Sequence, residues 1–305
     1  MSTPANVVLF GAGASLGSGS VMPKPPPLGA DLFPVLRRLF PTVWGGLSIE
    51  HIKELERDFE AGMQRIGKEN PHALPPLQRA MAAFFFDFIP GNDNLYRKLA
   101  QRIQTKSWSG ALVTLNYERL LELSLIFEGV QPFIGTATNN NPSVELCLPH
   151  GCCHIFCESV RGTAQGVSFS GTNVVTRGSV KVVSDPNEFA QRIKLDAFPP
   201  VMSYFDPLKL TTSCINFIES QRSRYTELIN GAEKVVIVGI RVRPHDTHLW
   251  SALAETKADL TYCSGKSGGQ EFLHWAVEQR PNKINENLGD YFADSFEIIC
   301  EHLSL

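Results

Sequence analysis

The sequence lacks an excess of charge of either sign and any long apolar run. Its 305 residues include 28 lysines and arginines against 31 aspartates and glutamates, which gives a formal net charge of −3. Nucleic-acid-binding domains are usually basic, so we expect no direct nucleic-acid binding. The most apolar segment, 81–89, is interrupted by Asp87. It is far shorter than the ~20 residues that cross a bilayer, so we expect no membrane span.

A paired cysteine framework and a basic amino-terminal segment are also missing. The seven cysteines are an odd number and no Cys-x-x-Cys occurs. The first residues, Met1–Pro4, contain no positive charge of the kind that opens a secretory signal peptide. Scattered cysteines fit a reducing compartment better than a secreted scaffold. With 43% hydrophobic residues, we expect a soluble, cytoplasmic globular protein with one large domain or two closely joined ones.

The common phosphate-binding motifs are incomplete. Gly11-Ala12-Gly13 follows an apolar strand over 6–10, and the N–H groups of such a turn can approach a pyrophosphate. The dehydrogenase fingerprint requires a third glycine where this sequence has Leu16, and no Gly-Lys-Ser/Thr loop occurs. We therefore expect neither a hydride-transfer enzyme nor an NTPase.

Short β-branched runs alternate with helical periodicity, which predicts an α/β fold with a doubly wound, Rossmann-like parallel sheet. Buried strands are expected at 6–10, 111–115, 145–149, 234–240 and 259–263. We assign 1–30 and 108–305 to this domain, 31–107 to a helical insertion, and 155–200 to a small β-hairpin and loop insertion, with hairpins within 160–184.

Small or polar residues follow each predicted strand. They are Gly11–Ser15, Asn116, His150-Gly151, Gly239 with Arg241, and Ser264-Gly265. Ligands of parallel sheets bind at the carboxyl ends of the strands. Turn geometry alone explains the glycines, but it does not explain Asn116 and His150. We therefore expect a binding site at this edge of the sheet.

Four of these segments, in this order, resemble the motifs of sirtuins. They are Gly11-Ala12-Gly13-Ala14-Ser15, Thr114-Leu115-Asn116-Tyr117-Glu118, Pro149-His150-Gly151 and Val238-Gly239-Ile240-Arg241. The resemblance covers residue 6 to about residue 265, and it is closest to the divergent bacterial sirtuin-like domains that consume NAD.

The resemblance implies an NAD+ hydrolase that yields nicotinamide and ADP-ribose. Asn116 would orient the nicotinamide ribose and the attacking water, and His150 would be the general base, since imidazole titrates near neutral pH. Arg241 would contact a phosphate or Asp246. The NAD-binding residues implied are Gly11, Ala12, Gly13, Ala14, Ser15, Thr114, Gly239, Ile240, Arg241, Asp246, Ser264 and Gly265.

Several departures from the deacylase sirtuins put deacylation in doubt. The zinc module of two Cys-x-x-Cys pairs is absent, Glu118 stands in place of aspartate, and a proline-rich segment over 19–28 replaces Pro-Asp-Phe-Arg. The alternatives are a zinc-free NAD-dependent deacylase or ADP-ribosyltransferase, and a non-catalytic sensor of NAD or ADP-ribose.

Structural interpretations of the same residues stay open. His150 can be a turn histidine, and Asn116 and Asp246 can be helix caps. Four cysteines and one histidine lie within eleven residues, at Cys147, Cys152, Cys153, His154 and Cys157. Adjacent side chains on a strand point to opposite faces, so we expect buried free cysteines and no metal.

The resemblance also implies a biological setting, because related bacterial domains act in anti-phage defence by depleting NAD. An unregulated NAD hydrolase would harm its host. We therefore expect a low basal rate and a trigger, either assembly into a homo-oligomer or a partner such as an Argonaute-like or ATPase protein.

Overall fold

The computed structural model describes residues 4–135, 142–158, 176–203, 213–243 and 246–305. The chain divides into two compact units, which are described separately. Unit 1 comprises Met1–Pro26, Phe88–Pro149 and Gln221–Leu305, and unit 2 comprises Pro27–Asp87 and His150–Ser220. No helix among the described residues is long and apolar enough to cross a membrane.

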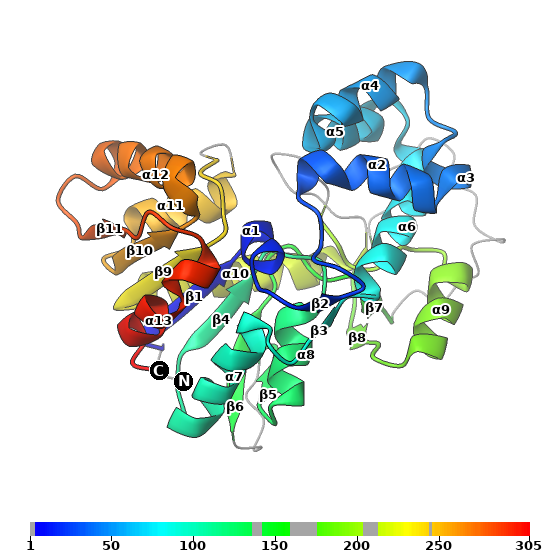
Figure 1. Ribbon diagram of the computed structural model, residues 1–305. Coiled ribbons are helices and arrows are strands. Elements are labelled where there is room, and N and C mark those ends of the chain that lie inside the picture. The colour runs from blue at the N-terminus through cyan, green and yellow to red at the C-terminus, as the bar shows by residue number, and fades with distance from the viewer. Residues whose placement is uncertain (1–3, 136–141, 159–175, 204–212, 244–245) are drawn as a thin grey trace. The chain divides into compact units, whose positions relative to one another are not determined.

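Unit 1 is built on a seven-stranded sheet whose pairs are all parallel (Figure 1). The strand order is β11-β10-β9-β1-β4-β6-β5. The strands are β1 (Asn6–Phe10), β4 (Ala111–Thr114), β5 (Gln131–Phe133), β6 (Ser143–Cys147), β9 (Lys234–Val238), β10 (Asp259–Cys263) and β11 (Asn285–Asn287). The predicted Rossmann-like α/β fold is thereby confirmed.

Helices cover both faces of this sheet because successive residues of a buried strand point to opposite sides. Val7 and Leu9 pack with α10, α11 and α12, whereas the Phe10 ring meets Tyr96 of α7 and Phe292 of α13. The helices are α1 (Ala12–Leu16), α7 (Leu95–Lys106), α8 (Leu120–Phe127), α10 (Ile215–Gly231), α11 (Thr247–Glu255), α12 (Gly265–Gln279) and α13 (Phe292–His302).

The order of the strands places a topological switch point between β1 and β9. From β1 the chain builds one half of the sheet through β4, β5 and β6, and it returns to the other side of β1 with β9. The connections that follow two strands at a switch point lead to opposite sides of the sheet. They leave a crevice at the carboxyl ends of these strands, where ligands bind in folds of this kind. A short antiparallel pair, β2 (Val21–Met22) and β3 (Ile89–Pro90), completes unit 1.

Unit 2 contains six helical segments from the range 31–107 that we assigned to an insertion, and α9 (Pro186–Leu195) from outside it, whereas α7 from the same range belongs to unit 1. The six segments are α2 (Gly29–Leu39), α3 (Pro41–Trp44), α4 (Ile49–Arg57), α5 (Phe59–Glu69), the 3-10 turn η1 (Pro71–Ala73) and α6 (Leu74–Phe86). Three of the helices in unit 2 begin at side-chain caps: Ser48 accepts from the His51 N–H, Asp58 from the Ala61 N–H, and Asp185 from the Glu188 N–H. Such caps satisfy donors that a helix leaves unpaired.

The β part of unit 2 is an antiparallel pair, β7 (Ile155–Cys157) with β8 (Val180–Val182). Most of the segment for which we predicted hairpins, 160–175, lies outside the described residues. Cys157 forms a disulfide with Cys214. The expectation that Cys157 is a free cysteine is therefore wrong, because its partner lies 57 residues away and no local pattern marks the pair.

Candidate functional site

A buried hydrogen-bond network joins the turn after β1 to the turn after β4. Asn116 Nδ2 lies 2.8 Å from Ser15 Oγ and 3.1 Å from the carbonyl oxygen of Gly11. Ser15 Oγ donates in turn to Glu118 Oε1 at 2.5 Å. Ser15 is 1% exposed and Asn116 is 7% exposed. The structure thus brings together three predicted site residues, Gly11, Ser15 and Asn116, at the carboxyl ends of neighbouring strands.

This network fixes the orientation of the Asn116 amide. A side-chain amide has two N–H donors and one carbonyl acceptor, and here both donors serve the protein, one bonded to Gly11 and one to Ser15. The backbone N–H of Asn116 donates to Thr114 Oγ1 at 3.1 Å. Among the described residues, Asn116 Oδ1 has no hydrogen-bond partner, so the network holds a carbonyl oxygen ready to accept.

Tyr96, on α7, completes the network. Its hydroxyl lies 3.0 Å from Ser15 Oγ. Because the only hydroxyl hydrogen of Ser15 goes to Glu118, the Tyr96 hydroxyl is the donor in this contact. Burial, and next the negative charge of Glu118, raise the pKa of Tyr96 well above its ordinary value, so the phenol keeps the proton that it donates. Sequence reasoning missed Tyr96, which has the spacing of a core residue.

Glu118 also accepts a hydrogen bond from the first residue of the following helix. The Leu120 N–H donates to Glu118 Oε2 at 2.5 Å. The interpretation of Asn116 as the cap of this helix is therefore wrong, because the Leu120 N–H donates to a carboxylate two residues after Asn116. The carboxylate of Glu118 thus links helix α8 to the Ser15 hydroxyl.

The glycines after β1 and β9 pack directly against each other. The Gly11 and Gly13 N–H groups donate to the carbonyls of Val238 and Gly239, at 2.9 and 3.0 Å. A Cβ on Gly239 would lie 2.0 Å from the backbone nitrogen of Ala14. These glycines therefore serve close backbone packing at the switch point. The Ala14 N–H is also used internally, on the Gly11 carbonyl at 3.0 Å.

Among the described residues, Arg241 does not contact Asp246, one of the two partners that we expected for it. It is exposed, and its guanidinium pairs with Glu271 on α12 at 3.2 Å. The expected contact with Asp246 is therefore wrong, because a carboxylate from the next βα unit is the neighbour. Asp246 is buried at the N-cap position of α11, and its side chain makes no capping hydrogen bond.

Ser264 and Gly265 open α12 at the end of β10. Gly265 has a φ of +74°, and its N–H donates to the carbonyl of Asp290 at 2.9 Å. A Cβ on Gly265 would lie 2.5 Å from the Tyr291 ring. Glycine is therefore required by both backbone conformation and the neighbouring ring.

His150 begins the second part of unit 2, directly after Pro149, the last residue of the middle part of unit 1. It is 7% exposed, and its carbonyl accepts from the Ser203 N–H at 2.9 Å. Asn116 belongs to unit 1. The pairing of His150 with Asn116 therefore stays a prediction.

The cysteines that follow His150 do not have the strand geometry that we assumed. Cys152, Cys153 and His154 form a turn before β7, so their side chains do not alternate between two faces. Their ligand atoms lie within 4.8 Å of one another, and all three residues are buried. The geometric argument against a metal at these residues is therefore wrong.

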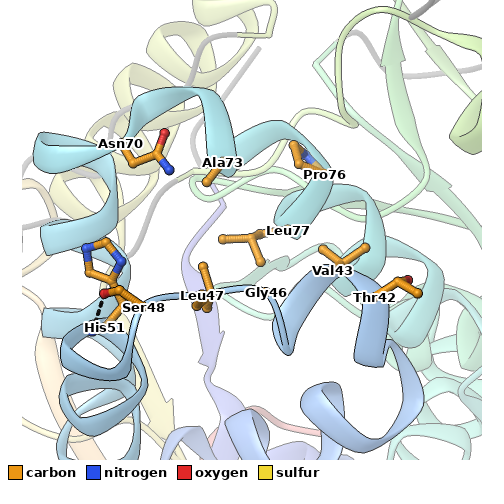
Figure 2. A pocket seen from close by; sticks show the side chains of 10 residues that line it. All are labelled: Thr42, Val43, Gly46, Leu47, Ser48, His51, Asn70, Ala73, Pro76 and Leu77. Atoms are coloured by element: carbon orange, nitrogen blue, oxygen red, sulfur yellow. Dashed lines mark hydrogen bonds between the residues drawn. The ribbon is translucent and has the colours of Figure 1, made fainter.

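A pocket of about 370 Å³ lies in the helical part of unit 2, and Figure 2 shows Val43, Leu47 and Leu77 around its centre. At its rim, His51 Nε2 lies 2.9 Å from a carboxylate oxygen of Glu69. The pocket is lined by Thr42, Val43, Gly46, Leu47, Ser48, His51, Asn70, Ala73, Pro76 and Leu77. None of the predicted site residues is among them.

Comparisons with known proteins match the chain to solved structures at low sequence identity. No family model matches the chain, and no curated protein matches its sequence. Among solved structures, it is similar to a Sir2 homologue in complex with NAD, at 13% identity and a TM-score of 0.49, over 98% of this chain and 89% of the other.

Two further solved structures give similar values. One is a point mutant of a Sir2 homologue in complex with ADP-ribose, at 12% identity and a TM-score of 0.48, over 98% of this chain and 91% of the other. The second comes from work on the structural basis of sirtuin substrate affinity, at 15% identity and a TM-score of 0.44, over 97% and 93%.

Proposed function

We propose that the chain is a sirtuin-like NAD+ hydrolase, which splits NAD+ into nicotinamide and ADP-ribose. The observation that carries the proposal is the fixed side chain of Asn116. Its two amide hydrogens bond to Gly11 and Ser15, and its carbonyl oxygen is left as an acceptor at the carboxyl end of the sheet. An acceptor held there suits a ribose hydroxyl or a water molecule, both of which donate hydrogen bonds.

The proposed reaction breaks the glycosidic bond between C1′ of the ribose and the nicotinamide nitrogen. The bonding electron pair goes to that nitrogen and neutralises its positive charge, so the leaving group needs no proton. A water oxygen forms the new bond to C1′, and its proton passes to the imidazole of His150 and then to solvent. Catalysis then depends chiefly on the positions of water and ribose, which Asn116 would control.

The proposed NAD-binding residues follow four neighbouring strands of the sheet. In addition to β1, these strands are β4, β9 and β10. Gly11, Ala12, Gly13, Ala14 and Ser15 follow β1, Thr114 ends β4, Gly239, Ile240, Arg241 and Asp246 follow β9, and Ser264 and Gly265 follow β10. In this proposal the phosphates lie beside the turn after β1 without bonding to the N–H groups of Gly11 and Gly13, which are already used within the fold.

The proposed biological role is that of an effector in bacterial anti-phage defence. Loss of NAD+ stops metabolism in the infected cell, so the hydrolase must stay slow until infection. We propose that assembly of a homo-oligomer, or a partner of the Argonaute-like or ATPase kind, raises the rate. If the isolated protein turns over NAD+ rapidly while its host grows normally, this part of the proposal is wrong.

The test is nicotinamide release from NAD+, measured by liquid chromatography at high enzyme concentration. We expect release by the wild type and a loss of about 100-fold or more in Asn116→Ala and in His150→Ala. The matched controls are Asn92→Ala and His274→Ala, two exposed residues, which should keep the wild-type rate. Unchanged release in Asn116→Ala would contradict the proposal.

The alternatives give different results in the same assay. Release that requires an added acyl-lysine peptide would indicate a deacylase, and labelling of a protein by ADP-ribose would indicate a transferase. Tight binding of NAD+ without release, unchanged in His150→Ala, would indicate a sensor.

A further inference from the structure

The turn after His150 and Gly151 gathers two thiols and one imidazole inside unit 2. The ligand atoms of Cys152, Cys153 and His154 lie within 4.8 Å of one another. His154 Nδ1 is 3.1 Å from Cys152 Sγ. The three residues are 2%, 0% and 1% exposed. Thiolate and neutral imidazole are the donors that zinc prefers in proteins.

We infer that Cys152, Cys153 and His154 bind one zinc ion. The donor set differs from two Cys-x-x-Cys pairs, which this sequence does not contain. The inference does not depend on the proposed hydrolase activity, because all three ligands lie in unit 2 and the ion serves that unit's structure.

The distances allow such a site with a small side-chain adjustment. Zinc holds sulfur at ~2.3 Å and nitrogen at ~2.0 Å, which puts tetrahedral donor atoms ~3.5–3.8 Å apart. The ligand atoms now lie within 4.8 Å of one another. Rotations of the three side chains within this single turn bring them to the separations that zinc requires. Three ligands leave a fourth position for water or another donor, as in zinc sites with two cysteines and one histidine.

The net charge of the proposed site also favours zinc binding at this buried position. Each thiol loses its proton to solvent on binding, so two thiolates and a neutral imidazole around Zn²⁺ have no net charge. A buried site without net charge avoids the large cost of burying an isolated ion. The soft sulfur donors disfavour magnesium and calcium, which prefer oxygen.

The backbone around the turn is held against a second segment of the same unit. The Cys152 N–H donates to the Val201 carbonyl at 3.0 Å, and the Val201 N–H donates to the Ile155 carbonyl at 2.7 Å. Gly151 has a φ of +75°, and a Cβ there would lie 1.9 Å from the Val201 oxygen. A zinc ion would restrict the conformation of the turn between Cys152 and Ile155, which these bonds hold against Val201, and would so stabilise the fold of unit 2.

Elemental analysis of the whole chain tests the site. The protein is purified with a reductant, supplied with zinc, dialysed against metal-free buffer and analysed by mass spectrometry for zinc and copper. We expect about one zinc per chain, with an at least roughly tenfold loss in Cys153→Ser and in His154→Ala. The matched control is Cys300→Ser, a buried free thiol of α13, which should keep its zinc.

Cobalt substitution gives a readout that does not depend on comparing variant folds. Wild-type protein loaded with Co²⁺ should show the near-ultraviolet absorption of a thiolate-to-cobalt transition, and zinc should abolish it. Absence of both zinc and this band would overturn the inference. Stoichiometric copper in place of zinc, or a disulfide between Cys152 and Cys153 in the reduced preparation, would overturn it as well.

Discussion

The side-chain nitrogen of Asn116 donates to the Ser15 hydroxyl across 2.8 Å, although 101 residues separate the two in sequence. This bond links the turn after β1 to the turn after β4. It uses one of the two amide hydrogens of Asn116, and Gly11 takes the other. The orientation of the proposed catalytic amide is therefore set by the residue that ends the glycine motif.

Ser15→Ala should lower the rate of nicotinamide release and should moderately destabilise the protein. The change removes the acceptor of the Tyr96 hydroxyl, one of the two acceptors of Asn116 Nδ2, and one donor to Glu118. We expect a rate loss of about 10- to 100-fold and a destabilisation of about 1–3 kcal/mol. Steady-state kinetics and urea unfolding check both. A wild-type rate in Ser15→Ala would show that the network does not position Asn116.

Tyr96→Phe should have a milder effect than Ser15→Ala. The phenylalanine ring keeps the edge contact with Phe10, whose ring centroid lies 5.2 Å away, and loses only the donor to Ser15. The Ser15 hydroxyl then still accepts from Asn116. We expect a loss of about 0.5–1.5 kcal/mol in the free energy of unfolding and a rate between those of the wild type and Ser15→Ala. A rate below that of Ser15→Ala would assign Tyr96 a separate role.

Gly239→Ala should destabilise the protein strongly, and Gly289→Ala should not. Both glycines have a positive φ, of +66° and +74°. A Cβ on Gly239 would lie 2.0 Å from the Ala14 nitrogen, whereas a Cβ on Gly289 would meet nothing within 4 Å. We expect a cost of roughly 1–2 kcal/mol for the backbone conformation at Gly289 and about 3 kcal/mol or more at Gly239, where packing is also disrupted. Thermal unfolding compares them, and equal melting temperatures would refute the packing argument.

The free energy of unfolding should fall as pH rises from 9 to 11. Burial raises the pKa of the Cys300 thiol from 9.0 to about 11. Between these values the unfolded chain releases a proton that the native chain keeps, so deprotonation favours unfolding. This thiol therefore contributes part of the fall between pH 9 and pH 11. Urea unfolding of the wild type and of Cys300→Ser across this range should show a shallower fall in the variant, and parallel curves would contradict the assignment.

Local sequence signals predicted the central strands of the sheet and three members of the hydrogen-bond network around Asn116. The central strands are continuous apolar runs, and the motifs that end them carry Gly11, Ser15 and Asn116 directly. Tyr96 could not be found in this way, because its contact with Ser15 spans 81 residues. The exposed pairing of Arg241 with Glu271 leaves no local pattern either.

The two edge strands of the sheet were missed for a physical reason. β5 (Gln131–Phe133) contains Pro132, and β11 (Asn285–Asn287) is wholly polar. Edge strands need not be buried on both faces, and proline is tolerated there because one side of the strand has no partner. They therefore carry none of the apolar pattern by which the inner strands were recognised.

The central claim is tested most directly by the products that the wild-type protein forms from NAD+ alone. Nicotinamide and ADP-ribose are quantified together, without any acyl peptide or acceptor protein, in the wild type and in Asn116→Ala. Hydrolysis controlled by Asn116 predicts equal amounts of the two products from the wild type and almost none from the variant. Nicotinamide without an equal amount of ADP-ribose, or equal release by both proteins, would contradict the account.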